Sequence, residues 1–137
     1  MTIHILLVDD SATFVSAARN VLDVMPGVDV IGHAYGGREA LEKAELLRPD
    51  LVLLDIGMPG MNGLEVGRRM RLSPSGPRIV FLSMDDNAVY RAAARDIGAE
   101  GFIGKANFVL ELIPLLESLV EATAGQENRR LAPSLVP

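Results

Sequence analysis

LVLLDIGMPGMNG, at residues 51–63, decides the fold of this chain, because four apolar residues run directly into an acid and a Gly- and Pro-rich turn. A continuous run of Leu and Val is typical of a strand that is buried on both faces of a parallel sheet. Runs rich in Ile, Val and Leu recur at four other places: Ile3–Val8, Val28–Ile31, Ile79–Leu82 and Gly101–Ile103. We therefore expect five buried strands.

The segments between these runs have helical spacing. Three apolar stripes fit a period of 3.6 residues: Phe14, Ala18, Val21, Leu22 and Met25; Ala40, Leu41, Ala44 and Leu47; Val89, Ala92, Ala93 and Ile97. Ser11 is placed to cap the first helix, and Pro26-Gly27, Pro49 and Gly98 stand where helices should stop. Five alternations of strand and helix predict right-handed crossovers, and hence a doubly wound α/β fold with helices on both faces of the sheet.

The last helix is less regular than the others. Asn107 can cap a helix whose stripe includes Phe108, Leu112 and Leu116, but Pro114 lies inside it and predicts either a bend or a late start. From residue 125 the sequence is polar and lacks a periodic stripe. We expect one domain over residues 1–124 and a flexible tail or truncated linker over residues 125–137.

Composition excludes several classes of function. The 137 residues carry a formal net charge of −5, which argues against direct binding of nucleic acid. Cysteine is absent, which excludes disulfides, thiolate zinc and cysteine catalysis and agrees with a reducing cytoplasm. The N-terminal apolar run is too short for a signal peptide or a membrane span. We expect a cytoplasmic protein without a membrane partner.

Polar residues follow four of the five expected strands. Asp9 and Asp10 follow the first strand, Asp55 the third, Ser83 the fourth and Lys105 the fifth, whereas the second strand ends without such a residue. In an open parallel sheet the ligand site lies outside the carboxyl ends of the strands. These side chains are therefore expected to converge in one crevice.

Three adjacent carboxylates repel one another unless a cation shares their site. Mg²⁺ suits them because it prefers hard oxygen ligands and is commonly held by one or two carboxylates and a phosphoryl oxygen. Lys105 and Ser83 supply an ammonium and a hydroxyl for the other oxygens of a phosphoryl group. Asp55 is the candidate nucleophile, as in aspartyl-phosphate chemistry. His4 and His33 are isolated and are expected to be structural or exposed.

The segments VDDSATF, DLVLLDIGMPGMNG, IVFLSM and GAEGFIGKA together resemble the receiver domain of bacterial two-component response regulators over about residues 3–124. The most specific piece is DIGMPGMNG, in which Met58-Pro59 and Gly63 follow Asp55 at the spacing of the family. The resemblance implies a flavodoxin-like sheet of strand order 2-1-3-4-5, as in chemotaxis regulators.

The resemblance also implies roles for the residues at the strand ends. Asp55 matches the phosphoacceptor and also a metal ligand. Asp10 matches the acid that binds Mg²⁺ directly, Asp9 the acid that supports the metal through water, and Gly57 the residue that offers a backbone carbonyl.

Ser83 matches the hydroxyl residue that moves toward the phosphoryl group, Lys105 the lysine that contacts it, and Phe102 the aromatic switch residue. Receivers accept the phosphoryl group from a sensor histidine kinase and catalyse only their own phosphorylation and dephosphorylation. The switch is implied to alter the surface of the fourth helix, fifth strand and fifth helix. That surface would control a downstream protein, an output domain or a homodimer formed on phosphorylation.

Three positions depart from the pattern of the family. Met84 stands where Ala or Gly is usual and is expected to narrow the route to Asp55. Ala106 stands where many members have Pro. Phe102 lacks the hydroxyl of the Tyr found in many members, so its inward state would depend on packing.

Other interpretations stay open from the sequence. A Mg²⁺-dependent phosphohydrolase of the haloacid dehalogenase type also uses an aspartyl nucleophile, although its nucleophile follows the first strand. A flavin binder has the same topology, but Asp9 and Asp10 would repel its phosphate. The segment NRRLAPSLVP resembles the linker of regulators with a LuxR-type DNA-binding domain, so the chain is either a stand-alone receiver or part of a longer protein.

Overall fold

The computed structural model describes residues 2–131, with side chains described through residue 122. Strands and helices alternate along the described chain as the sequence predicts. The strands are β1 (Ile3–Val8), β2 (Val28–Ala34), β3 (Leu51–Asp55), β4 (Arg78–Ser83) and β5 (Gly101–Gly104). The α-helices are α1 (Ala12–Leu22), α2 (Gly37–Leu47), α3 (Gly63–Arg71), α4 (Ala88–Ile97) and α5 (Phe108–Leu131), with the 3₁₀-helix η1 (Lys105–Asn107) before α5.

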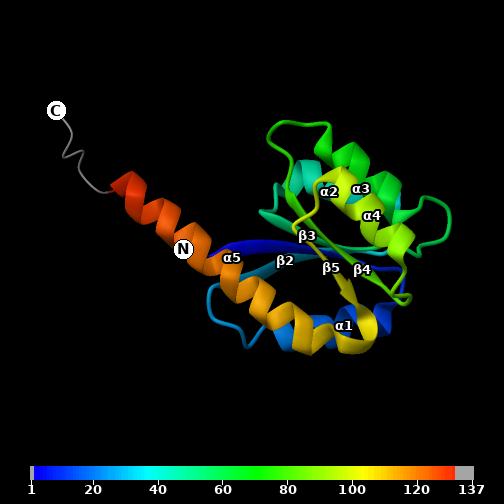
Figure 1. Ribbon diagram of the computed structural model, residues 1–137, viewed down its shortest axis with the longest axis horizontal. Coiled ribbons are helices and arrows are strands. Elements are labelled where there is room, and N and C mark those ends of the chain that lie inside the picture. Colours follow the sequence, from blue (N-terminus) through cyan, green and yellow to red (C-terminus); the bar gives the residue numbers. More distant parts are fainter. Residues whose placement is uncertain (1, 132–137) are drawn as a thin grey trace.

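The five strands form one parallel sheet of order β2-β1-β3-β4-β5, which confirms the expected doubly wound topology. Helices cover both faces of the sheet: α1 and α5 lie on one side, and α2, α3 and α4 lie on the other (Figure 1). The three central strands are β1, β3 and β4, so the polar residues that follow them lie at the middle of one sheet edge.

Each face of the sheet has its own hydrophobic core. One core joins Leu7, Leu53 and Val80 of the sheet to residues of α1 and α5. The other joins the alternate strand positions, such as Leu54 and Phe81, to α2, α3 and α4. All five residues of β3 are buried, which accounts for its continuous apolar sequence.

Helix boundaries agree with most of the predicted signals. The Ser11 hydroxyl accepts a hydrogen bond from the backbone N–H of Phe14 at 3.2 Å, as expected of an N-cap. Gly98 ends α4 with a φ of 86°, in the left-handed region that glycine favours. Met25 was expected to extend the first stripe, but α1 ends at Leu22. Met25 still packs against the same core from the loop.

Helix α5 begins at Phe108, directly after Asn107, and continues through Pro114. The late start that the proline allowed is therefore excluded. The helix extends to Leu131, past the expected boundary at residue 124, so residues 125–131 are helical. Their assignment as a linker stays a prediction, and residues 132–137 lie outside the described part of the chain.

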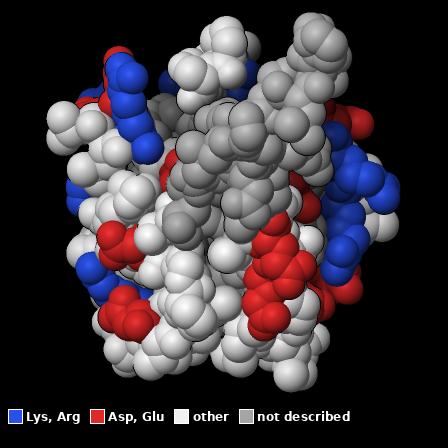
Figure 2. Space-filling model, turned by 90° about the vertical axis from the view of Figure 1, so that its left-hand side faces the viewer, with Lys and Arg blue, Asp and Glu red and all other residues white. Residues whose placement is uncertain are grey.

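The surface carries both signs of charge. On the face from which α5 projects, groups of Asp and Glu alternate with groups of Lys and Arg, and neither kind covers the whole face (Figure 2). Among the described residues, no helix has the length and apolarity that crossing a membrane requires.

Candidate functional site

The register of the sheet brings the predicted site residues to one edge. Val8 pairs with Leu54, so Asp9 and Asp55 follow neighbouring positions of β1 and β3. Ser83 pairs with Gly104, which places Lys105 just beyond the end of β5. The pairing of the parallel strands thus brings side chains from distant parts of the sequence to one edge of the sheet.

Asp9, Asp10 and Asp55 each offer a carboxylate oxygen, and these three oxygens lie within 4.8 Å of one another. Asp9 and Asp55 are only 1% and 3% exposed, whereas Asp10 is exposed. The Oδ1 atom of Asp9 accepts the backbone N–H of Ser11 at 2.9 Å. This donor set, two buried acids and one exposed acid, has the hard oxygen chemistry of a divalent-cation site.

Lys105 extends its ammonium into this acidic cluster. Its Nζ lies 2.5 Å from Oδ2 of Asp9 and 3.3 Å from Oδ1 of Asp55, and the lysine side chain is 10% exposed. The buried Oδ2 of Asp9 accepts no hydrogen bond of good geometry, so its pairing with Lys105 is an ion contact rather than an aligned hydrogen bond. The single ammonium of Lys105 therefore pairs with two buried carboxylates. Because Oδ2 of Asp9 accepts no hydrogen bond, this oxygen can still act as a ligand.

Burial raises the pKa of Asp55 above its ordinary value, and the neighbouring charge of Asp9 raises this pKa further. Lys105 and the backbone N–H of Gly57, which donates to Asp55 Oδ1 at 3.4 Å, lower this pKa and so favour the ionised form. The carboxylate is thus desolvated but retains a cationic neighbour. Such a setting favours attack by a carboxylate, because fewer water molecules solvate it or compete with it for an electrophile.

The loop after β3 packs closely against the backbone of Asp55. A Cβ on Gly63 would lie 2.0 Å from the Asp55 carbonyl oxygen, so only glycine allows this approach. The N–H of Gly63 donates to the carbonyl of Ile56 at 3.0 Å, and Gly60 turns the loop with a φ of 80°. Gly57 is exposed beside Asp55, with open space where a Cβ would stand.

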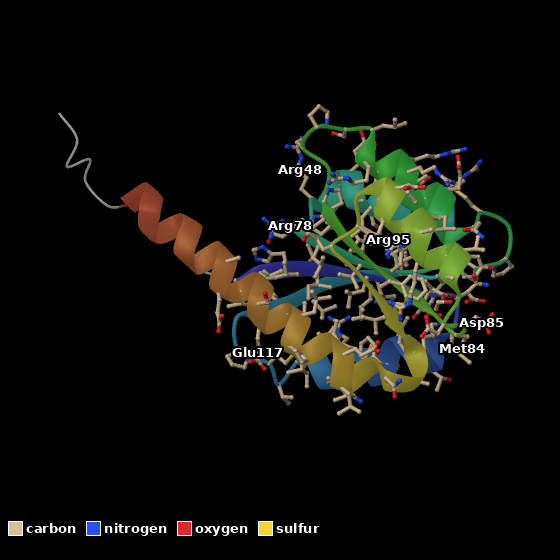
Figure 3. The ribbon with its side chains drawn as sticks, viewed as in Figure 1. Arg48, Arg78, Met84, Asp85, Arg95 and Glu117 are labelled. Carbon is tan, nitrogen blue, oxygen red and sulfur yellow. The ribbon has the colours of Figure 1, made fainter. Side chains whose placement is uncertain are left out.

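The Ser83 hydroxyl is buried and bonds within its own loop. It donates to the carbonyl of Asp85 at 2.9 Å and accepts the N–H of Asp85 at 3.1 Å. Among the described residues it makes no hydrogen bond with Asp55. Met84 is 77% exposed, and Figure 3 places Met84 and Asp85 beyond the end of β4, at the opposite end of the sheet from Arg78.

Phe102 is half-buried on β5, and the Arg91 guanidinium lies over its ring at 4.7 Å from the centroid. Arg91 Nε is in turn 2.5 Å from Oδ1 of Asp86, in the loop that follows Ser83. Arg91 and Phe102 also line a surface hollow of about 200 Å³ between α4 and β5. Sequence reasoning missed Arg91 and Asp86, because their spacing of five residues differs from the spacing of three or four that marks ion pairs along a helix.

The two histidines lie apart from the acidic cluster. His4 Nδ1 is 3.2 Å from Oδ2 of Asp50, and the ring of His33 lies 5.0 Å from that of Tyr35. Neither contributes to the group of potential metal ligands found among the described residues. The expectation that they are structural or exposed agrees with these contacts.

Comparisons with known proteins agree with this geometry. Residues 5–117 match the family described as response regulator receiver domain. The chain is 37% identical over 122 residues to the nitrate/nitrite response regulator protein NarL of Escherichia coli K12, covering 89% of this chain and 55% of that protein. It is 43% identical over 112 residues to a protein-glutamate methylesterase/protein-glutamine glutaminase of Geobacillus kaustophilus, covering 81% of this chain and 32% of that protein.

Among solved structures, the signal receiver domain of the putative response regulator NarL from Mycobacterium tuberculosis superimposes with a TM-score of 0.80 at 28% identity, covering 88% of this chain and 97% of that one. The chain spans about half, or less, of the length of the curated relatives that it matches. The family match covers most of the chain and includes every strand-end residue described above. The chain therefore belongs to the response regulator receiver domain family.

Proposed function

We propose that this receiver domain accepts a phosphoryl group on Asp55 from a sensor histidine kinase, in a reaction that depends on Mg²⁺. The observation that carries this proposal is the convergence of three carboxylates and the Lys105 ammonium at one sheet edge. The domain acts as an enzyme only toward its own phosphorylation and dephosphorylation.

In the proposed transfer, an Oδ atom of Asp55 forms a bond to phosphorus. The bond from phosphorus to the donor breaks, and the leaving group keeps its electron pair: a histidine nitrogen in the kinase, or acetate when acetyl phosphate is the donor. Lys105 favours the ionised, attacking form of Asp55 and remains close enough to pair with a phosphoryl oxygen. The chain thus contributes nucleophile, position and positive charge.

Asp9, Asp10 and Asp55, with the backbone carbonyl of Gly57, are the proposed ligands of Mg²⁺. The fit is supported by the three clustered oxygens and by the buried Asp9 Oδ2, which lacks an aligned hydrogen-bond donor. When bound, the ion supplies two positive charges that neutralise the carboxylates and the incoming phosphoryl oxygens.

Ser83 and Phe102 are the proposed switch. A phosphoryl oxygen on Asp55 is a stronger acceptor than the Asp85 carbonyl, so we expect the Ser83 hydroxyl to leave Asp85 and donate to it. That movement displaces the loop that carries Asp86, which anchors the Arg91 stacked on Phe102. Phe102 is then free to turn inward and reshape the surface of α4, β5 and α5.

The proposed output is an altered docking surface for a downstream protein, an output domain or a second phosphorylated copy. NarL and the methylesterases extend well beyond the region that this chain matches, so their whole activities are not transferred to it. The resemblance of residues 128–137 to a LuxR-type linker favours an output domain that binds DNA, with no DNA contact by the receiver itself.

The test uses acetyl phosphate as the donor. Wild type, Asp55→Asn and the control Asp50→Asn, an exposed acid at the other end of the sheet, are incubated with acetyl phosphate and their intact masses are compared. We expect one added phosphoryl group on wild type and Asp50→Asn with Mg²⁺, and none on Asp55→Asn or with EDTA. Equal labelling of Asp55→Asn contradicts the assignment, and sustained turnover of p-nitrophenyl phosphate would favour a phosphohydrolase instead.

A further inference from the structure

An aromatic pair lies beside the ammonium of Lys105. The Nζ atom of Lys105 lies over the ring of Phe14, 4.7 Å from its centroid. Phe14, near the start of α1, contacts the buried Phe108 at the start of α5 edge to face, with centroids 5.1 Å apart and an interplanar angle of 77°. The two helices thus hold an aromatic face against the one cation among the described residues that pairs with both Asp9 and Asp55.

The contact with Phe14 differs in kind from the other contacts of Lys105. The carboxylate oxygens of Asp9 and Asp55 also suit a divalent cation, so a metal ion competes with the lysine for these oxygens. The ring of Phe14 is not a metal ligand and does not compete. A cation–π contact with a desolvated ammonium is also stronger than one at an exposed site, and this lysine is only 10% exposed.

We infer that Phe14 is a positioning residue, which holds the Lys105 ammonium within reach of Asp55 after a metal has taken the carboxylates. The inference rests on the proposed function of Lys105 and adds a residue that the acidic cluster alone does not identify. Phe108 supports the arrangement by fixing the ring of Phe14 rather than by contacting the ammonium.

A spectroscopic test is direct because the sequence contains two lysines, Lys43 and Lys105. In protein labelled with ¹³C-lysine, protons near the face of an aromatic ring are shifted upfield. The Lys105 side-chain signal is expected upfield of that of Lys43 both in EDTA and after addition of Mg²⁺ and beryllofluoride, an analogue of the phosphoryl group. Phe14→Leu should abolish the shift and Phe14→Tyr should retain it. A Lys105 signal that coincides with Lys43 in the presence of both ligands overturns the inference.

A kinetic test measures the rate of Asp55 phosphorylation by acetyl phosphate at saturating Mg²⁺. Phe14→Leu is expected to slow the reaction about fivefold to thirtyfold, the range between the strongest exposed cation–π contacts and a desolvated one, and Phe14→Tyr to change it less than about twofold. In a Lys105→Met background, Phe14→Leu should have less than about a twofold further effect, because its partner is gone. Equal losses in both backgrounds indicate a structural role and refute the inference.

The outcomes separate the two proposals. If wild type takes up no phosphoryl group on Asp55, the proposed function fails. If wild type is labelled normally and Phe14→Leu reacts at the wild-type rate, the function stands and only the role of Phe14 is wrong. Urea unfolding of both Phe14 variants verifies that the folded state persists under the conditions of the assay.

Discussion

Replacing Lys105 by Met tests whether a cation is needed to hold the acidic cluster together. Methionine keeps the unbranched apolar stem of lysine but lacks its charged terminal nitrogen. In metal-free protein this change leaves Asp9 and Asp55 buried without their shared positive partner. The expected result is a large loss of folding stability that Mg²⁺ restores.

The magnitude follows from the two contacts. At separations of 2.5 Å and 3.3 Å, an effective dielectric constant of about 20 gives attractions of about 5 to 7 kcal/mol each. Desolvation of the three charges offsets much of this, and breaking a buried ion pair by removing one partner typically costs about 3–5 kcal/mol. We expect the free energy of unfolding to fall by that amount at neutral pH, and by less at low pH, where Asp55, whose pKa is raised by burial, takes up a proton.

The assay is urea unfolding of wild type and Lys105→Met, in EDTA and in Mg²⁺. The matched control is Lys43→Met, which removes the other lysine. Lys43 forms a partly exposed i,i+4 pair with Glu39 and donates to the His33 carbonyl at 2.6 Å, so its loss is expected to cost less than that of Lys105, about 1–2 kcal/mol. Mg²⁺ should stabilise Lys105→Met more than wild type, because no ammonium competes for the carboxylates. A loss below about 1 kcal/mol in EDTA, or indifference to Mg²⁺, would refute the electrostatic account of the site.

Two further predictions concern Asp55 and the switch. Burial raises the folded-state pKa of Asp55, so folding favours its protonated form. Metal-free wild type should therefore lose folding stability as pH rises through that pKa, whereas Asp55→Asn should not. Urea unfolding of both in EDTA between about pH 4 and about pH 8 tests this, and parallel pH profiles would contradict it. Arg91→Met removes the cation from the ring of Phe102 and should shift that ring toward its buried position, whereas Arg95→Met, in the same hollow, should not. Fluorine NMR of fluorophenylalanine-labelled protein measures the populations of the exposed and buried positions of the Phe102 ring. An identical Phe102 signal in wild type and Arg91→Met would show that Arg91 does not hold the ring.

The sequence predicted the sheet because its signals were strong and local. Continuous apolar runs identified all five strands, and in β3 every residue proved to be buried. The strand ends were harder to predict: β2 extends to Ala34, three residues beyond the predicted Ile31, because Gly32 and His33 interrupt the apolar pattern. Pro114 suggested a bend or a late start, yet α5 begins at Phe108 and continues through the proline, with Leu112 and Leu116 packed against the core.

The candidate site was predictable as a set of residues but not as a set of contacts. Residues after parallel strands must share one edge, so Asp9, Asp55 and Lys105 could be grouped from the sequence. The direction in which each side chain points depends on neighbours that are distant in sequence. For that reason the sequence did not reveal that Lys105 lies over Phe14, or that the Ser83 hydroxyl bonds to the backbone of Asp85.

Charge balance links these contacts to the proposed switch. Three carboxylates and one ammonium leave about two negative charges at the sheet edge, which a divalent cation cancels. A phosphoryl group on Asp55 then adds about one further negative charge and several strong acceptor oxygens. The nearby groups that can respond are Lys105, already paired with Asp55, and Ser83, whose hydroxyl is held by its own loop. Since the lysine is in place beforehand, we propose that the movement that would report phosphorylation comes from Ser83. The loop from Met84 to Asn87, rather than β5, is therefore the element whose displacement should precede the rotation of Phe102.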